Sequence, residues 1–156
     1  MCIVVDTNTL GPVMIPTDAK HEDFAPVLRW ITVGKGKLVY GGSTYRKEVF
    51  ERMRRFNGVI GELRKKGRCV VLNHAHVDAA EKRARAAEPS PDFDDAHLVA
   101  IFDVSGCRVL CSNDQRADRF VQDRRLYERH EPPSIYRRAD HAHLLCNKNI
   151  VACCQP

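Results

Sequence analysis

The sequence lacks long hydrophobic runs, and this absence excludes a membrane-spanning protein. Its apolar stretches are far shorter than the ~20 residues that a helix needs to cross a bilayer. The first residues, Met-Cys-Ile-Val-Val-Asp, contain neither a basic segment nor an extended apolar one, so they are typical of a β-strand and not of a secretory signal. We therefore expect a cytoplasmic protein with no membrane partner.

Cysteine pairs of the Cys-x-x-Cys type are also absent, although the chain has seven cysteines. An odd number without such pairs favours reduced thiols in the core. Four cysteines lie in apolar, strand-like stretches: Cys2, Cys69, Cys107 and Cys111. The adjacent Cys153 and Cys154 could bind a soft metal or oxidise, but the sequence offers them no second pair of ligands.

A phosphate-binding loop, internal repeats and low-complexity segments are missing too. The bend at residues 34–37, Gly-Lys-Gly-Lys, is too short for a P-loop and lacks its Lys-Ser/Thr ending. With 156 residues, 44% hydrophobic and 29% charged, the chain fits one soluble domain covering residues 1–156. A net charge of +5 favours a polyanionic partner, without identifying it as nucleic acid.

What the chain does contain is an alternation of short apolar runs and segments with helical periodicity. We predict strands near residues 3–5, 38–40, 68–72, 107–111 and 134–136. We predict helices near residues 23–31, 45–63, 74–87 and 92–105, with Ser43 and Asn73 as caps and with Gly58 and Gly61 dividing the second helix. This alternation predicts an α/β fold, with a central parallel sheet flanked by helices and all strands ending at one edge.

Acidic residues stand at the ends of these elements. Asp6 follows the first strand, and Asp114 follows the fourth. Glu48 borders the apolar stripe of a helix, where the alternative role is a surface ion pair with Arg52. Together with Asp95, these acids would repel one another at one edge unless cations lay among them. Oxygen ligands select hard ions such as Mg²⁺ or Mn²⁺.

The most unusual stretch runs from Asp92 to Val104, where three acids lead directly into apolar sequence. This pattern predicts a buried helix that begins at the acids and stops at Gly106. Helix capping or solvation is the expected role of Asp92 and Asp94. Asp95 lies inside the apolar run, and a carboxylate that enters a core needs a partner, so we expect it to bind a cation.

Four short acidic motifs thus occur in order: Val4-Val5-Asp6-Thr7-Asn8, Gly41-Gly42 through Glu48, Asp94-Asp95-Ala96-His97-Leu98-Val99-Ala100, and Ser112-Asn113-Asp114. In this order and spacing they resemble the motifs of PIN-domain ribonucleases. The resemblance covers residues 3–120 and implies a sheet in the order 3-2-1-4-5. Residues 131–156 have no matching motif and are expected to complete the fold as a C-terminal segment.

The resemblance implies a Mg²⁺- or Mn²⁺-dependent endoribonuclease that hydrolyses phosphodiester bonds of single-stranded RNA. The catalytic and metal-binding acids would be Asp6, Glu48, Asp95 and Asp114. The residues that support them would be Asn8, Ser112 and Asp94. From their place near the acidic edge, the arginines expected to bind RNA phosphates are Arg46, Arg116 and Arg119. The family includes toxins, so a cognate inhibitor protein and a homodimer are further expected partners.

Three alternatives were compared with this interpretation. A haloacid-dehalogenase-like phosphotransferase also begins with a strand ending in aspartate, but its Asp-x-Asp-x-Thr motif is here Asp-Thr-Asn-Thr at residues 6–9, without the second acid. A response-regulator receiver domain would need a lysine near its last strand, and residues 107–114 offer none. A non-catalytic PIN-like module that binds RNA or a protein stays open, although loss of one acid would favour it and all four are present.

Overall fold

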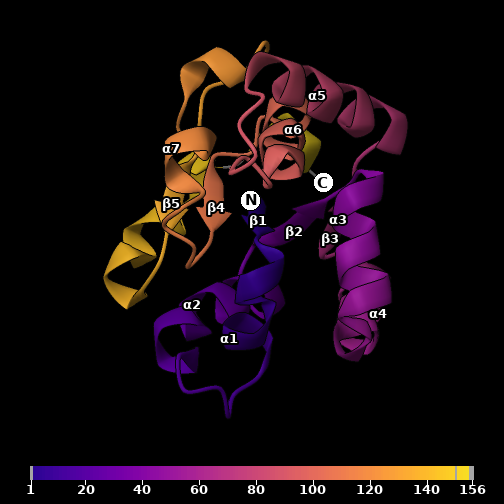
Figure 1. Ribbon diagram of the computed structural model, residues 1–156. Helices are drawn as coiled ribbons and strands as arrows, with labels where there is room; N and C mark the ends of the chain where they lie inside the picture. Colours follow the sequence, from indigo (N-terminus) through magenta and orange to yellow (C-terminus); the bar gives the residue numbers. More distant parts are fainter. Residues whose placement is uncertain (1, 150, 155–156) are drawn as a thin grey trace.

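The computed structural model describes residues 2–149 and 151–154. At its centre is a five-stranded sheet whose neighbouring strands are all parallel (Figure 1). The strands are β1 (Cys2–Val5), β2 (Lys37–Tyr40), β3 (Cys69–Val71), β4 (Val109–Cys111) and β5 (Ser134–Tyr136). Their order in the sheet is β3-β2-β1-β4-β5, which confirms the predicted α/β fold and the strand order 3-2-1-4-5.

The central strand β1 has neighbours on both sides. Ile3 lies opposite Leu38 of β2, and Val4 lies opposite Leu110 of β4. Every residue of β1 is buried. A parallel strand that helices cover on both faces is apolar throughout, which is why Cys-Ile-Val-Val forms it. Because the strands run in the same direction, the residues that follow them leave the sheet at one edge.

Helices lie on both sides of this sheet. They are α1 (Leu10–Met14), α2 (His21–Thr32), α3 (Ser43–Arg46), α4 (Asn57–Lys65), α5 (His74–Ala87), α6 (Ala96–Ser105) and α7 (Asp118–Val121). Helix α5 packs against α6, and α1 packs against α2 on the other side (Figure 1). A π-helical turn covers Lys47–Arg52, and 3-10 segments cover Thr7–Thr9, Arg54–Phe56, Arg124–Leu126, Ala139–Leu144, Asn147–Asn149 and Ala152–Cys154.

Helix α6 is the buried helix that its apolar sequence predicts. Of its ten residues, only Val104 is not fully buried, so the helix lies inside the core. It ends at Gly106, whose φ of 66° is left-handed and confirms the predicted stop. The helix begins at Ala96, later than the acids at which we expected it to start.

The acids before α6 do not cap it. Asp95 occupies the N-cap position, but its side chain accepts no hydrogen bond from the helix. Asp92 and Asp94 are exposed, and Asp92 pairs with Arg119 at 2.9 Å. Of the two expected roles, capping and solvation, both acids therefore fit solvation, and the supporting role expected for Asp94 stays a prediction. Arg85 of α5 donates to the carbonyl of Asp94 at 3.1 Å and holds this loop outside the helix.

The helical segment after β2 is interrupted, but not at its glycines. The chain bends at Met53, with φ −110° and ψ 45°, between the π-helical turn and the next 3-10 segment. The predicted division at Gly58 and Gly61 is wrong, because both lie within α4. Glycine lowers helix propensity without ending a helix whose other side chains, here Ile60 and Leu63, pack on the core.

Of the two predicted helix caps, one is confirmed and one is wrong. Asn73 caps α5, and its side chain accepts from the backbone N–H of His76 at 3.2 Å. The N-cap of α3 is Gly42, with a φ of 80° that favours glycine, and Ser43 is the first helical residue. The hydroxyl of Ser43 donates instead to Asp78 at 2.7 Å, a contact between distant parts of the chain.

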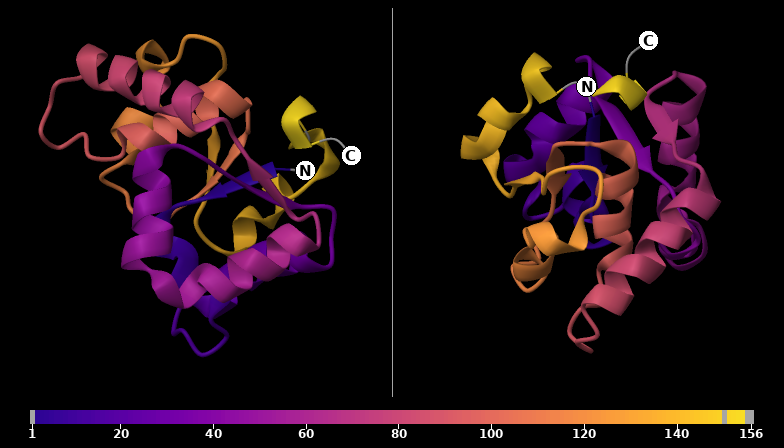
Figure 2. Two further views of the ribbon diagram at one scale, coloured as in Figure 1. Left: turned by 90° about the vertical axis from the view of Figure 1, so that its right-hand side faces the viewer. Right: turned by 90° about the horizontal axis from the view of Figure 1, so that it is seen from above.

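Residues near the two ends of the chain are covalently joined. Cys2, at the start of β1, forms a disulfide with Cys154. Residues 151–154 lie beside the N-terminal strand (Figure 2). The expectation of a reduced thiol is therefore wrong for Cys2, while Cys69, Cys107 and Cys111 are free as predicted. Only the fold brings together two cysteines that are 152 positions apart.

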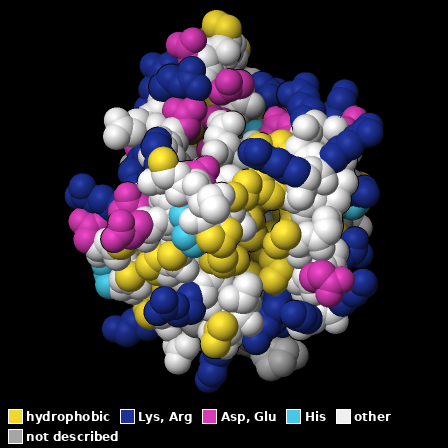
Figure 3. Space-filling model, turned by 90° about the horizontal axis from the view of Figure 1, so that it is seen from below, with side chains coloured by type: hydrophobic (Ala, Val, Ile, Leu, Met, Phe, Trp, Pro, Cys, Tyr) yellow, Lys and Arg dark blue, Asp and Glu magenta, His cyan; other side chains and the backbone are white. Residues whose placement is uncertain are grey.

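The surface gives two further observations. Within residues 2–149 and 151–154, no helix is long and apolar enough to cross a membrane. The face seen in Figure 3 has hydrophobic side chains at its centre and Lys and Arg around them. Val33, Val59 and Val71 are exposed large apolar residues, and single exposed residues of this kind are normal on a folded domain.

Replacing the glycine that ends α6 should destabilise the protein. In Gly106→Ala the left-handed conformation costs roughly 1–2 kcal/mol. The added Cβ would also lie 2.8 Å from the ring of His130. Urea denaturation should therefore give a lower free energy of unfolding than that of the parent.

The matched control is Gly61→Ala, where the space around the added Cβ is open. There the free energy of unfolding should rise by about 0.5–1 kcal/mol. Equal effects of both substitutions would contradict this account.

Candidate functional site

The site begins with Asp6, which follows the buried end of β1. Its carboxylate is 1% exposed and is held at both oxygens. Ser112 donates its hydroxyl to Oδ2 at 2.8 Å, and the backbone N–H of Asn8 donates to Oδ1 at 3.2 Å. Burial raises the pKa of Asp6, and these two hydrogen bonds partly oppose the rise. The carboxylate is therefore fixed in position before any ligand arrives.

Asp114 follows β4 and is linked to Asp6 through one side chain. Its backbone N–H donates to the hydroxyl oxygen of Ser112 at 3.1 Å, so Ser112 contacts both acids. The carboxylate of Asp114 also accepts from the guanidinium of Arg116 at 2.8 Å. This hydrogen bond lowers the pKa of Asp114 and keeps it ionised.

Glu48 reaches the same edge from the π-helical turn Lys47–Arg52. Its Oε2 accepts from the hydroxyl of Thr7 at 3.0 Å and lies 3.7 Å from Nε2 of His97. Within the described part of the chain these are its polar partners, so the alternative pairing with Arg52 is not formed. π-helical turns occur frequently at functional sites, and this one directs Glu48 toward the end of β1.

Asp95 lies close enough to the other acids for their charges to change its pKa. Burial raises its pKa from 3.8 to about 7, with further contributions from the charges of Asp6, Asp94, Asp114 and Glu48. Such coupling requires that these carboxylates lie near one another. The structure therefore brings all four predicted acids, Asp6, Glu48, Asp95 and Asp114, to the carboxyl edge of the sheet.

A hollow of about 280 Å³ opens at this edge. Its lining residues are Thr7, Asn8, Glu48, Arg52, Met53, Asp94 and Asp95. A larger hollow of about 700 Å³ contains none of the four acids and includes residues 105–106, beyond the opposite end of α6. We place the candidate site at the smaller hollow, because Glu48 and Asp95 line it and the pKa of Asp95 is raised. Asp6 and Asp114 do not line it.

The sequence analysis missed His97, which faces the acids from inside α6. It is 2% exposed, and neither of its ring nitrogens has a hydrogen-bond partner in the described structure. A buried polar atom without a partner is costly, and in a site it indicates an absent ligand or water. The signal in the sequence was a histidine two positions after Asp95 within an apolar run.

The fit of a divalent cation can be judged from the spacing of the acids. Among the described residues, no three acidic side chains bring oxygen atoms within 4.8 Å of one another. Mg²⁺ usually keeps several waters and takes one or two carboxylates directly. The arrangement therefore suits a hydrated ion held partly through water, and it does not form a closed cage of carboxylates.

The predicted RNA-binding arginines are divided in space. Arg116 and Arg119 line a second hollow. Asp94 lines both this hollow and the one that contains Glu48 and Asp95, so the two hollows adjoin. Arg119 also lies over the ring of Phe120 at 4.5 Å. Arg46 lines neither hollow, and its guanidinium lies 3.3 Å from Nε2 of His74.

No family model, no curated protein and no solved structure matches the chain. The resemblance to PIN-domain ribonucleases therefore stays a prediction, which rests on the four motifs and on the arrangement described above.

Replacing Asp95 should stabilise the metal-free protein at neutral and alkaline pH. The folded-state pKa of about 7 lies above the ordinary value of 3.8, so the folded state holds the proton more tightly than the unfolded state. The free energy of unfolding of the parent therefore falls as the pH rises from about 4 to about 7. The Asp95→Asn variant has an uncharged side chain at this position at every pH. Its free energy of unfolding should therefore not fall over this range. Thermal melts in EDTA across this range measure the difference.

The control for this experiment is Asp94→Asn, a neighbouring exposed acid. It should change the pH dependence of the melting temperature less than Asp95→Asn does, because burial is the largest cause of the raised pKa of Asp95 and the charge of Asp94 is a smaller one. A larger effect at Asp94 than at Asp95 would show that the buried member of the pair has been misidentified.

Proposed function

We propose that this chain is a PIN-like endoribonuclease that depends on Mg²⁺ or Mn²⁺. The observation that carries the proposal is the charge coupling at the carboxyl edge of the sheet, where burial and four other acids raise the pKa of Asp95 to about 7. Repulsion of this kind is relieved by a bound cation, and perturbed carboxylates in a hollow are typical of catalytic sites. The net charge of +5 suits a polyanionic substrate.

The residues that would hold the ion directly or through water are Asp6, Glu48, Asp95 and Asp114. When bound, Mg²⁺ or Mn²⁺ lowers the pKa of coordinated water and neutralises charge on a phosphodiester. Asp6 is the most rigid of the four acids, since Ser112 and the backbone of Asn8 hold both of its oxygens. We assign Asp6 the role of fixing the ion, and Glu48 and Asp95 the role of orienting the attacking water.

Two arginines near the acids could bind phosphates of the RNA backbone. Arg116 is exposed, and its guanidinium bonds to Asp114, two positions away in sequence. It could turn toward a phosphate if a cation replaced it at that carboxylate. Arg119 lies in the same hollow, with its exposed guanidinium paired to Asp92. A single strand crossing from this hollow to the acids would place one phosphodiester at the candidate ion.

A second candidate function is a non-catalytic PIN-like module that binds RNA or a protein. Two observations favour it: Arg116 already neutralises Asp114, and no three acidic side chains of the described structure come within 4.8 Å of one another. A cognate inhibitor protein and a homodimer remain proposed partners under either function. A cytoplasmic location remains a prediction, and the Cys2–Cys154 disulfide is more typical of oxidising compartments.

Asp6→Asn should abolish cleavage of single-stranded RNA while the fold survives. The amide keeps the shape of the side chain and one of its two acceptor oxygens, which can accept from Ser112 or from the backbone of Asn8 but not from both. It also removes the anionic ligand. We expect the loss of rate to exceed the ~10–100-fold that follows loss of an outer partner of a metal ligand. Cleavage of a labelled single-stranded RNA in Mg²⁺ or Mn²⁺ measures the rate, and circular dichroism monitors the fold.

The matched control is Asp140→Asn, an acid-to-amide change at an exposed residue that pairs with Arg138 and lines neither hollow. It should cut RNA at the parental rate. Melting curves separate the two candidate functions, since a bound ion at ~100 times its Kd stabilises the folded parent by about 2.7 kcal/mol. A parent without any metal-induced shift and without cleavage would support the non-catalytic module.

RNA affinity should fall steeply with salt, because neutralised phosphates release counterions. Arg116→Gln and Arg119→Gln should each weaken binding and reduce the slope of log Kd against log salt by about one unit or less. Arg46→Gln is the comparison, because Arg46 lines neither hollow. Binding to RNA in EDTA at several salt concentrations gives these slopes. A flat salt dependence of the parent would contradict a basic binding path.

A further inference from the structure

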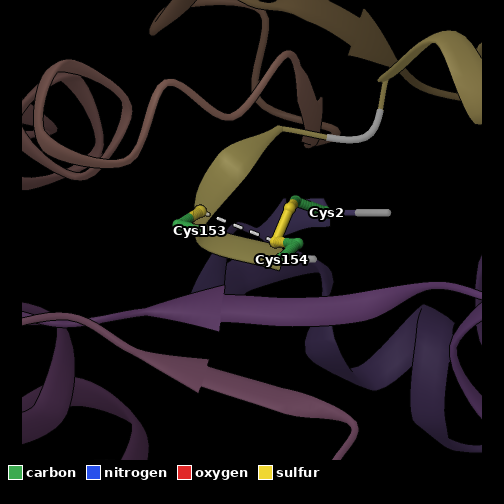
Figure 4. A group of neighbouring side chains, drawn as sticks. All are labelled: Cys2, Cys153 and Cys154. Atoms are coloured by element: carbon green, nitrogen blue, oxygen red, sulfur yellow. Dashed lines mark hydrogen bonds between the residues drawn. A yellow bond between two sulfur atoms is a disulfide. The ribbon is translucent and has the colours of Figure 1, made fainter. Parts of the chain in front are cut away.

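Three sulfur atoms from distant parts of the chain meet at the start of the sheet (Figure 4). Cys2 begins β1, while Cys153 and Cys154 lie in the 3-10 segment Ala152–Cys154. Their sulfur atoms all lie within 4.8 Å of one another, the only group of three potential metal ligands with this spacing among the described residues. Cys154 is bonded to Cys2, and its sulfur lies 3.6 Å from that of Cys153.

This cysteine group is separate from the acidic site. Cys2 starts β1 and Asp6 follows its end, so the two lie at opposite ends of one strand. A strand rises by about 3.3 Å per residue, which places their backbones roughly 13 Å apart. The ligand type differs as well, since thiolates are soft and carboxylates are hard.

The burial of the three cysteines defines an enclosed site with one open side. Cys2 and Cys154 are buried, at 0% and 2% exposure, and Cys153 is half-buried. An ion bound here would be covered on the side of the sheet and reached from the side of Cys153.

We propose that Cys2, Cys153 and Cys154 bind Zn²⁺ once the Cys2–Cys154 disulfide is reduced. Zinc takes thiolate ligands at about 2.3 Å in tetrahedral geometry, so its sulfur ligands lie about 3.8 Å apart. The sulfurs of Cys153 and Cys154 already lie 3.6 Å apart. The fold thus supplies the third ligand that adjacent cysteines lack in the sequence.

The proposal requires a reductant, and a dithiol supplies it. The dithiol gives two electrons and two protons to the Cys2–Cys154 bond, which becomes two thiols, and is itself oxidised to a cyclic disulfide. Zinc then replaces the protons of three thiols, and three protons are released. The disulfide joins the sulfurs of Cys2 and Cys154, and the zinc-bound state would use these two and that of Cys153. Each state connects residues 153–154 to β1.

The sulfur of Cys153 favours a metal site over a purely structural disulfide. A disulfide needs only two sulfurs, yet Cys153 lies in contact with one of them. Its alternative role is to attack Cys154 and exchange the disulfide, which would leave Cys2 as the free thiol. Metal binding and exchange give different results in the following experiment.

The test is a titration of the reduced full chain with Co²⁺, a spectroscopic substitute for zinc, under nitrogen and after removal of the dithiol. We expect sulfur-to-cobalt charge-transfer absorption that saturates with one Co²⁺ at the cysteine group of each chain and that Zn²⁺ abolishes by displacement. The oxidised parent should show no such absorption. Ions at the acidic site produce none either, so Asp6→Asn should titrate like the parent.

Two variants define the ligands. Cys153→Ser should bind more weakly by a factor larger than the ~10–100-fold effect of losing an outer partner of a ligand. Cys146→Ser removes another partly buried free cysteine of the C-terminal segment and should bind like the parent. If the reduced parent unfolds, Zn²⁺ should restore its circular dichroism.

The proposal is overturned by any of three results: no charge-transfer band in the reduced parent, full parental affinity in Cys153→Ser, or an unfolded reduced chain that zinc does not restore. Mass mapping that finds a Cys153–Cys154 disulfide, with no metal uptake after reduction, would assign the third sulfur to exchange instead.

Discussion

The hydrogen bond from Ser112 to Asp6 is the contact on which the acidic edge depends. It is buried and joins residues 106 positions apart, at the ends of β1 and β4. The same hydroxyl oxygen accepts from the backbone of Asp114, so one serine sets the distance between two acids. Without it, Asp6, which is 1% exposed, would keep only the hydrogen bond from the backbone of Asn8 to offset the cost of burying its carboxylate.

The remaining acids show how repulsion is tolerated in a folded protein. Thr7 holds Glu48, and Arg116 neutralises Asp114, while Asp95 responds by taking a pKa of about 7. His97 adds a buried ring without a hydrogen-bond partner in the described structure. An edge of this kind lowers the free energy of unfolding relative to an apolar edge. A ligand that binds between these groups in the folded state raises the free energy of unfolding again.

The strand β1 connects two chemically different ends. Its carboxyl end carries the acid that we assign to a hard cation, and its first residue carries a sulfur that meets Cys153 and Cys154. Because β1 is central and fully buried, a change at either end acts on a rigid element. The two sites can still be tested independently, since the first depends on oxygen ligands and the second on sulfur ligands.

The sequence by itself determined the elements whose causes are local. The alanine-rich run after Asn73 predicted α5, and the apolar run that stops at Gly106 predicted α6. The alternation of elements predicted a parallel sheet. The strand order came from the resemblance of the motifs. Tertiary structure decided the Cys2–Cys154 bond and the raised pKa of Asp95. It also decided the partnerless ring of His97 and the bend at Met53. These features depend on contacts between distant residues and on burial, and neither quantity is contained in a local pattern of residues.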